Sequence, residues 1–206
     1  STSVPLLENQ IEQAGDLFAR AFHDDPLNVY ALPDEEARAR SNPTYFSAFV
    51  KYGHLAGEVW TTEGTLDGVA VWIPPDTGVD TRPDLEDRSG ISALPSTVGV
   101  VAVDRKREVF DHLDRLHERD AEDPHWYLMF IGVEPNRQRQ GVGSALLQPA
   151  LSRADAEGMP SYLETFQPTN VPFYLKHGFE IVVEDVEPRS GIRFWTFRRE
   201  PRNEHR

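Results

Sequence analysis

The chain has 206 residues, of which 39% are hydrophobic and 27% are charged. This length and composition predict a single globular domain spanning residues 1–206. Cysteine is absent, which excludes disulfides, thiolate zinc sites, iron–sulfur clusters and cysteine-linked covalent intermediates. The formal net charge of −13, from 21 basic and 34 acidic residues, argues against nucleic acid as a partner. It would attract a cationic substrate, and the more common alternative is an acidic surface that serves solubility.

Residues 1–7 contain no basic run followed by an apolar core, as a secretory signal would require. No window approaches the roughly 18 uncharged apolar residues that a membrane-spanning helix needs. We therefore expect a cytoplasmic protein with no membrane partner.

Hydrophobic periodicity and turn residues predict the elements of the first half. In chain order these are a short edge strand at 4–7, a helix from Ile11 to Phe22 ended by Asp24-Asp25-Pro26, an apolar stretch at 45–50, and strands at 57–62 and 68–73. Residues 76–96 are rich in Pro, Gly, Asp and Ser, which predicts a surface excursion.

The second half alternates between helical and strand patterns. It predicts a helix at 104–118, a strand at 126–133 covered on both faces, a helix at 141–156, a strand at 161–165, a short helix at 171–177, and strands at 179–184 and 192–198. This order indicates a mixed α/β layer fold and excludes a helical bundle or a β-sandwich.

Residues 131–145 contain the strongest functional signal. An apolar strand leads into a short loop with Gly141 and Gly143, and the loop opens directly into a helix. Such a turn presents backbone N–H groups at the positive end of the helix dipole and suits a phosphate or pyrophosphate. Arg137 and Arg139 add positive charge. The alternative is a plain helix-initiating turn.

Two common phosphate motifs do not fit this loop. The dinucleotide fingerprint needs a third glycine where Leu146 stands, and the nucleotide-triphosphate loop needs Gly-Lys-Ser/Thr where Gly143-Ser144-Ala145 stands.

The pattern Gln-x-x-Gly-x-Gly at Gln138, Gly141 and Gly143 resembles the loop of the GNAT superfamily of acyl-CoA-dependent N-acyltransferases. Asn170, Phe173-Tyr174 and Gly178-Phe179 resemble the second signature of that superfamily. Further stretches are similar to its puromycin-acetylating branch: 21–26, 69–72, 126–128, 163–165, 170–174 and the helical Pro149.

The resemblance implies an α/β (α+β) GNAT fold, with a central, mostly antiparallel mixed sheet flanked by helices on both faces. It also implies transfer of an acetyl group from acetyl-CoA to a primary amine of a small molecule, such as puromycin or another antibiotic amine. Without a cysteine, the amine would attack directly in a ternary complex. Because many members of the superfamily dimerise, a homodimer is compatible with the resemblance.

The resemblance further implies a set of residues that contact acetyl-CoA. They are Ile131, Val133, Gln138, Arg139, Gln140, Gly141, Val142, Gly143, Ser144, Asn170, Phe173 and Tyr174. The backbone of 138–144 would wrap the pyrophosphate and the backbone of Val133 would pair with the pantetheine arm. The side chain of Val133 has a plain core role as its alternative, and Asn170 has a helix N-cap role.

Tyr174 and Glu164 are the catalytic candidates. By resemblance, Tyr174 lies near the sulfur of CoA and protonates the departing thiolate; a core aromatic is its alternative. The strand at 126–133 contains no carboxylate or histidine, so Glu164 at the end of the next strand is the candidate general base, acting directly or through water.

The acceptor amine is expected to meet Asp24, Asp25, Tyr30, His54, Trp126 and Glu164. The two aspartates could instead only end the preceding helix. An α-amine costs about 1 to 1.4 kcal/mol to deprotonate at pH 7 against roughly 4.6 kcal/mol for a lysine amine, which favours an aminoacyl-type acceptor.

No metal is expected, because His112 and His117 are five residues apart and do not share a helix face. The other histidines, His125 and His177 among them, suggest surface or supporting positions. Two further functions stay open: acetylation of a protein lysine or N-terminus, and a non-catalytic acyl-CoA-binding sensor.

Overall fold

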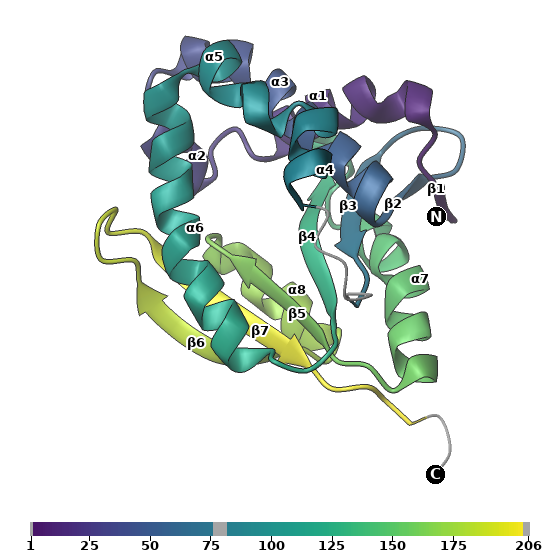
Figure 1. Cartoon of the computed structure of the whole chain (residues 1–206). Helices are drawn as coiled ribbons and strands as arrows, with labels where there is room; N and C mark the ends of the chain where they lie inside the picture. The colour runs from purple at the N-terminus through teal and green to yellow at the C-terminus, as the bar shows by residue number, and fades with distance from the viewer. Residues whose placement is uncertain (1, 76–81, 204–206) are drawn as a thin grey trace.

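The computed structural model describes residues 2–75 and 82–203. Seven strands and eight α-helices are recorded in these ranges (Figure 1). They are β1 (Ser3–Pro5), α1 (Ile11–Ala21), α2 (Pro26–Ala31), α3 (Glu35–Ala56), β2 (Glu58–Thr62), β3 (Gly68–Ile73), α4 (Arg82–Ser89), α5 (Leu94–Val98), α6 (Val100–Asp120), β4 (Trp126–Val133), α7 (Val142–Glu157), β5 (Ser161–Thr165), α8 (Val171–Lys176), β6 (Glu180–Val186) and β7 (Arg193–Arg199).

The strands form one seven-stranded sheet in the order β1-β2-β3-β4-β5-β7-β6. Every neighbouring pair is antiparallel except β4 and β5, which are parallel. This confirms the predicted fold class of a mostly antiparallel mixed sheet.

The central feature of the sheet is the short contact between β4 and β5. Only two residue pairs are in register, Trp126 with Ser161 and Tyr127 with Tyr162. Beyond them β4 follows β3 and β5 follows β7, so the two strands diverge. An opening in the middle of the sheet results.

A β-bulge in β4 widens this region. Val71 pairs with Phe130 and Trp72 pairs with Leu128, so Met129 is the extra residue. The strand is covered on both faces, as predicted, because its residues pack into the hydrophobic clusters on either side of the sheet. Tyr127, Met129 and Ile131 are nevertheless only half-buried. Met129 and Ile131 line a cavity.

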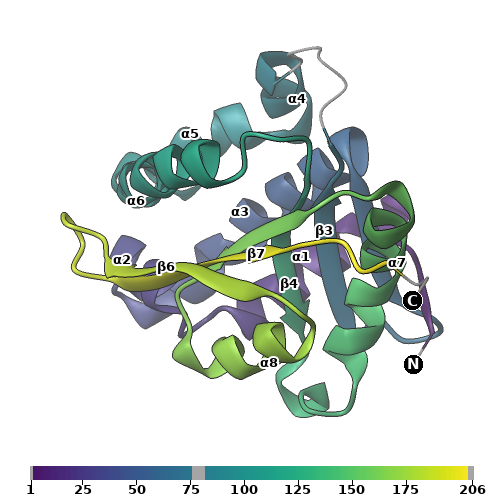
Figure 2. The ribbon, with the colours of Figure 1, turned by 90° about the horizontal axis from the view of Figure 1, so that it is seen from below.

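Helices cover both faces of the sheet, as predicted. On one face, Leu17 and Phe18 of α1 and Phe46 of α3 pack with Val69 and Val71. On the other face, α7 and α8 pack their apolar side chains against Trp72, Leu128 and Phe197. Helix α6 lies across β6 and β7 on the side opposite α8 (Figure 2).

Two segments differ from the sequence-based expectation. The described part of the predicted surface excursion, from residue 82 to 96, contains α4 and the start of α5, while 76–81 lie outside the described residues. Helix α2 was not predicted, although its capping signal was present: the Asp25 carboxylate accepts a hydrogen bond from the Leu27 amide at 3.0 Å, and Pro26 occupies the first turn.

Candidate active site

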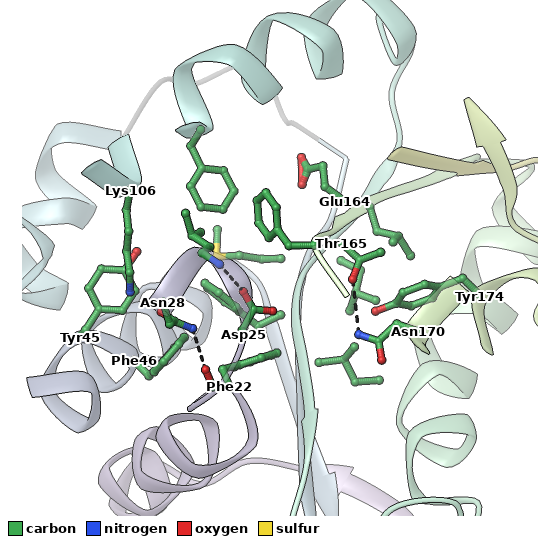
Figure 3. Close-up of a pocket in the computed structure, with 18 residues that line it drawn as sticks. Phe22, Asp25, Asn28, Tyr45, Phe46, Lys106, Glu164, Thr165, Asn170 and Tyr174 are labelled. Atoms are coloured by element: carbon green, nitrogen blue, oxygen red, sulfur yellow. Dashed lines mark hydrogen bonds between the residues drawn. The ribbon is translucent and has the colours of Figure 1, made fainter. Parts of the chain in front are cut away.

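A pocket lies at the opening between β4 and β5 (Figure 3). Its empty volume is about 700 Å³, open solvent at its mouth included. Side chains from α2, α3, α6, α8 and both strands line it: Phe22, Asp25, Leu27, Asn28, Tyr45, Phe46, Lys106, Phe110, Leu128, Met129, Phe130, Ile131, Leu163, Glu164, Thr165, Phe166, Asn170 and Tyr174.

Aromatic rings form much of the pocket wall. Phe22 and Phe46 have ring centroids 5.4 Å apart, and Phe130 lies 5.7 Å from Phe46 in an edge-on arrangement. Across the pocket, Phe110 meets Phe166 edge-on at 6.0 Å. This wall offers apolar contact and ring faces to an organic ligand and lowers the local dielectric around its charged groups.

Glu164 is a buried carboxyl group on this wall. Its side chain is 4% exposed, and it accepts a hydrogen bond from the Tyr127 hydroxyl at 2.8 Å. Burial, with a smaller contribution from Asp114, raises the pKa of Glu164 to about 8, against the opposing effect of the Tyr127 hydrogen bond. A carboxyl group with a pKa near the operating pH is suited to general-base catalysis.

Tyr174 reaches the pocket from α8 on the other side of the opening. Its ring is buried, and its hydroxyl has no hydrogen-bond partner within the described ranges. Burial, then the nearby charge of Asp25, raises the pKa of Tyr174 above its usual value of 10. The phenol therefore keeps its proton at neutral pH and can donate it.

Asp25 and Lys106 place opposite charges inside the pocket. Asp25 is 8% exposed and Lys106 is 6% exposed. Burial raises the pKa of Asp25 to about 6 and lowers the pKa of Lys106 to about 7. The attraction between the two opposite charges opposes both pKa shifts. The Lys106 ammonium lies 3.3 Å from the centroid of the Tyr45 ring, a cation–π contact.

The loop before α7 has the backbone geometry of an anion site. Gly141 is the N-cap of α7 with φ +84°, and Arg139 also has a positive φ of +60°. No side chain caps the N-terminus of α7, so the first N–H groups of this helix stay available to a ligand. Gln138 donates to the Val133 carbonyl at 3.3 Å and ties the loop to the end of β4.

Other loop residues have structural roles as well. A Cβ on Gly143 would lie 3.0 Å from the Phe173 ring, so glycine also allows α7 and α8 to approach closely. The Val142 side chain belongs to the core, which leaves only its backbone to a ligand. Ser144 Oγ lies 2.9 Å from His177 Nε2.

Several predicted residues meet in the pocket: Ile131, Glu164, Tyr174, Asn170 and Asp25. Asn170 does not cap α8 through its side chain, contrary to the alternative reading; its amide instead donates to Thr165 Oγ1 at 3.4 Å.

Four expected acceptor contacts do not line the pocket. Asp24 is largely exposed and lies 3.8 Å from Arg38, and His54 is exposed on α3. Trp126 is 1% exposed and packs edge-on against Trp72 in the core. The ring of Tyr30 lies beneath Arg105.

Sequence reasoning also missed contributors to the site. Lys106 and Tyr45 come from helices whose faces only the tertiary packing brings to the opening. His117 and His125 lie behind Glu164, with His117 Nδ1 3.8 Å from Glu164 Oε1. The sequence signal that could have found these residues is the apolar periodicity of α6, which places Lys106, Phe110 and His117 near one face of the helix.

The described residues contain neither a metal-binding cluster nor a membrane-spanning helix. Across 2–75 and 82–203, no cluster of three or more His, Cys, Asp or Glu side chains is arranged to hold a metal ion. Nor does any helix in these ranges combine the length and apolarity that crossing a membrane requires.

The fold and this site define a class of protein. Residues 15–179 match the model of the acetyltransferase (GNAT) family. The chain therefore belongs to the GNAT family. It is also 28% identical over 166 residues to an uncharacterised N-acetyltransferase of Schizosaccharomyces pombe. That match covers 77% of this chain and 66% of the relative, slightly less than two thirds of the relative's length.

Solved structures support the fold. A crystal structure described as histone acetyltransferase HPA2 and related acetyltransferase from Corynebacterium glutamicum has a TM-score of 0.69 at 23% identity, covering 100% of this chain and 98% of that one. A mosquito arylalkylamine N-acetyltransferase-like protein has a TM-score of 0.59 at 13% identity, covering 97% and 99%. At such identities the likeness shows the fold alone.

Proposed function

We propose that this protein transfers the acetyl group of acetyl-CoA to a primary amine of a small molecule, by direct attack within a ternary complex. The observation that carries the proposal is the pocket at the opening between β4 and β5, which is lined by Glu164 from β5 and by Tyr174 from α8. Family membership supports the same reaction class.

The residues around the opening suit acetyl-CoA. The uncapped start of α7 and the backbone of 138–144 would bind the pyrophosphate. The pantetheine arm would lie along β4 near Ile131 and Val133, where β4 lacks a partner on the β5 side. Bound there, acetyl-CoA supplies an activated thioester at the pocket.

Glu164 and Tyr174 then divide the proton transfers. Glu164 takes a proton from the acceptor ammonium, which leaves a neutral amine. As the new C–N bond forms and the C–S bond breaks, Glu164 accepts the second amine proton after releasing the first, and Tyr174 donates its proton to the departing sulfur. Tyr174 recovers a proton from solvent after the products leave.

The apolar and aromatic lining of the pocket favours a small organic acceptor over a protein side chain. This lining comes from six elements and contains several aromatic rings, so an organic amine would bury apolar surface against them. The test is a mass-spectrometric screen with acetyl-CoA and puromycin, aminoglycosides, polyamines, arylalkylamines and a lysine peptide. An acetylated small amine supports the proposal; acetylation of the peptide alone, or of nothing, contradicts it.

Asp25→Asn is expected to raise KM for the amine about tenfold with little change in KM for acetyl-CoA. Asp25 would attract the cationic acceptor inside a low-dielectric pocket, and asparagine removes that charge. Asparagine remains a good N-cap, so α2 should stay folded. Initial rates over a grid of both substrates measure the two constants. Equal rises in both KM values would contradict this role.

Gly141→Val is expected to weaken acetyl-CoA binding by at least about tenfold. Gly141 has φ +84°, a conformation that a β-branched residue adopts only with strain. Valine would therefore shift the loop away from the pyrophosphate. Calorimetric titration with acetyl-CoA measures the loss. Gly64→Val is the matched control, because Gly64 has φ +83° in a turn between β2 and β3; unchanged affinity in Gly141→Val would contradict the loop assignment.

A further inference from the structure

Behind the pocket, two histidines connect Glu164 to the protein surface. His117 on α6 has its Nδ1 atom 3.8 Å from Glu164 Oε1. Its other ring nitrogen, Nε2, lies 2.7 Å from His125 Nε2. His125 Nδ1 in turn lies 2.7 Å from the Asp123 carbonyl oxygen. The four groups form a row of proton donors and acceptors in which only the step from Glu164 to His117 is longer than a hydrogen bond.

The contacts determine where the hydrogens of this row lie. A backbone carbonyl only accepts, so His125 must donate to Asp123 from Nδ1. His125 Nε2 then has a free lone pair, which accepts the Nε2 hydrogen of His117. The Nδ1 lone pair of His117 is therefore left facing Glu164. This is the arrangement that a proton leaving Glu164 requires.

Exposure increases along the row. The Glu164 side chain is 4% exposed and the His117 side chain is 18% exposed, and His125 is half-buried beside an exposed turn. Arg198 fixes this turn through the Asp123 carboxylate, at 2.8 Å to each oxygen, and through the Asp120 carbonyl. The row thus begins in the pocket and ends at solvent.

Packing keeps His117 in a neutral form. Its ring stacks on Tyr162 at 4.2 Å with an interplanar angle of 12°, and Tyr127 lies 4.6 Å away. Burial, with a smaller effect from His125, lowers the pKa of His117 to about 4. The charged or titratable groups facing it are Glu164 on β5, His125 before β4, and Tyr127 and Tyr162 beneath it. A neutral imidazole can still relay a proton, because it accepts a proton at one ring nitrogen while it releases the proton of the other nitrogen.

We propose that His117 and His125 form a proton relay that carries to solvent the proton which Glu164 takes from the acceptor amine. The inference rests on the proposed function. Protonated Glu164 donates to His117 Nδ1, while the Nε2 hydrogen of His117 passes to His125 Nε2. The His125 imidazolium then releases a proton to solvent, and Glu164 is again a carboxylate. Reorientation of the rings restores the starting tautomers.

The geometry gives a reason for such a path. With acetyl-CoA and the amine bound, both would fill the pocket that Glu164 faces. Solvent could then not remove the proton from that side. The distance of 3.8 Å between His117 and Glu164 exceeds a hydrogen bond, and a small rotation or one bridging water closes it. His117 and His125 therefore act through Glu164 rather than on the substrate.

The test uses the variants His117→Gln and His125→Ala, with the best amine from the screen and acetyl-CoA. We expect kcat to fall roughly tenfold or more in each, KM for both substrates to stay within about twofold, and the remaining rate to depend on buffer concentration. Added imidazole should restore His125→Ala, because it replaces a ring close to solvent. His112→Gln is the control, since His112 lies on α6 against Phe194, away from the row.

Each outcome decides the question. Wild-type rates in His117→Gln or His125→Ala overturn the relay and leave the proposed function standing. Reduced rates without buffer dependence or imidazole rescue assign the histidines a structural role and also overturn it. A wild type that acetylates no amine overturns the proposed function, and the relay with it. If His117→Gln does not fold, as judged by thermal melting, the half-buried His125→Ala gives the same readouts.

Discussion

Glu164→Gln is expected to lower kcat/KM by at least about a hundredfold at pH 8.5, the lower range of what a positioned base contributes. Glutamine keeps the shape of the side chain and can still accept the hydrogen bond from the Tyr127 hydroxyl, but it cannot take a proton. The substitution therefore removes the base without leaving Tyr127 unpaired.

The pH profile makes this prediction specific. The pKa of Glu164 is raised to about 8, so the carboxylate is the minor form at pH 7 and the major form above pH 8. In the wild type, kcat/KM should rise about tenfold per pH unit toward pH 8 and then level off. The Glu164→Gln profile should lack this limb. Glu180→Gln, an exposed position on β6, is the control; an unchanged limb in Glu164→Gln would contradict the assignment.

Tyr174→Phe is expected to lower kcat by about ten- to a hundredfold while both KM values change little. The phenol donates its proton only as the thiolate leaves, so its loss affects the transition state rather than binding. Thiol release under saturating substrates measures the effect. Because water can still protonate the thiolate, some activity should remain.

The same substitution should leave the fold intact. The Tyr174 ring packs against Phe179 and Phe197, and phenylalanine keeps these contacts. Within the described part of the chain its hydroxyl has no hydrogen-bond partner that would be left unsatisfied. A melting temperature near that of the wild type, with reduced kcat, separates catalysis from stability. An unchanged kcat would remove Tyr174 from the catalytic role.

Local sequence signals predicted the sheet well, because its strands combine apolar runs with clear turn residues. The order of elements around 126–165 and the glycines at 141 and 143 indicated the loop and the helix behind it. Glu164 and Tyr174 could be proposed from the same signals together with the resemblance to the GNAT superfamily.

Long-range packing determined what could not be predicted. Asp25 was expected to end a helix or to contact the acceptor amine, and it lines the pocket as the N-cap of α2, a six-residue helix that was not predicted. Lys106 resembles a solvent-exposed helix residue in the sequence, and the rings of Tyr45 and Phe46 stabilise it in the interior.

His117 was judged against His112, its neighbour in sequence, whereas its actual partner is His125. That partner lies beyond the end of α6, and the turn fixed by Arg198 brings it back against the helix. No periodicity within one element reveals such a pair. Pairs across a turn and across the sheet become visible only in the folded chain.

The most direct test of the account is a crystal structure of the protein with acetyl-CoA. We expect the pyrophosphate within hydrogen-bond distance of the backbone N–H groups of 139–144, and the pantetheine arm in the opening between β4 and β5. The thioester carbon should lie between Glu164 and Tyr174. A donor bound elsewhere, or a thioester remote from both side chains, would contradict the assigned site.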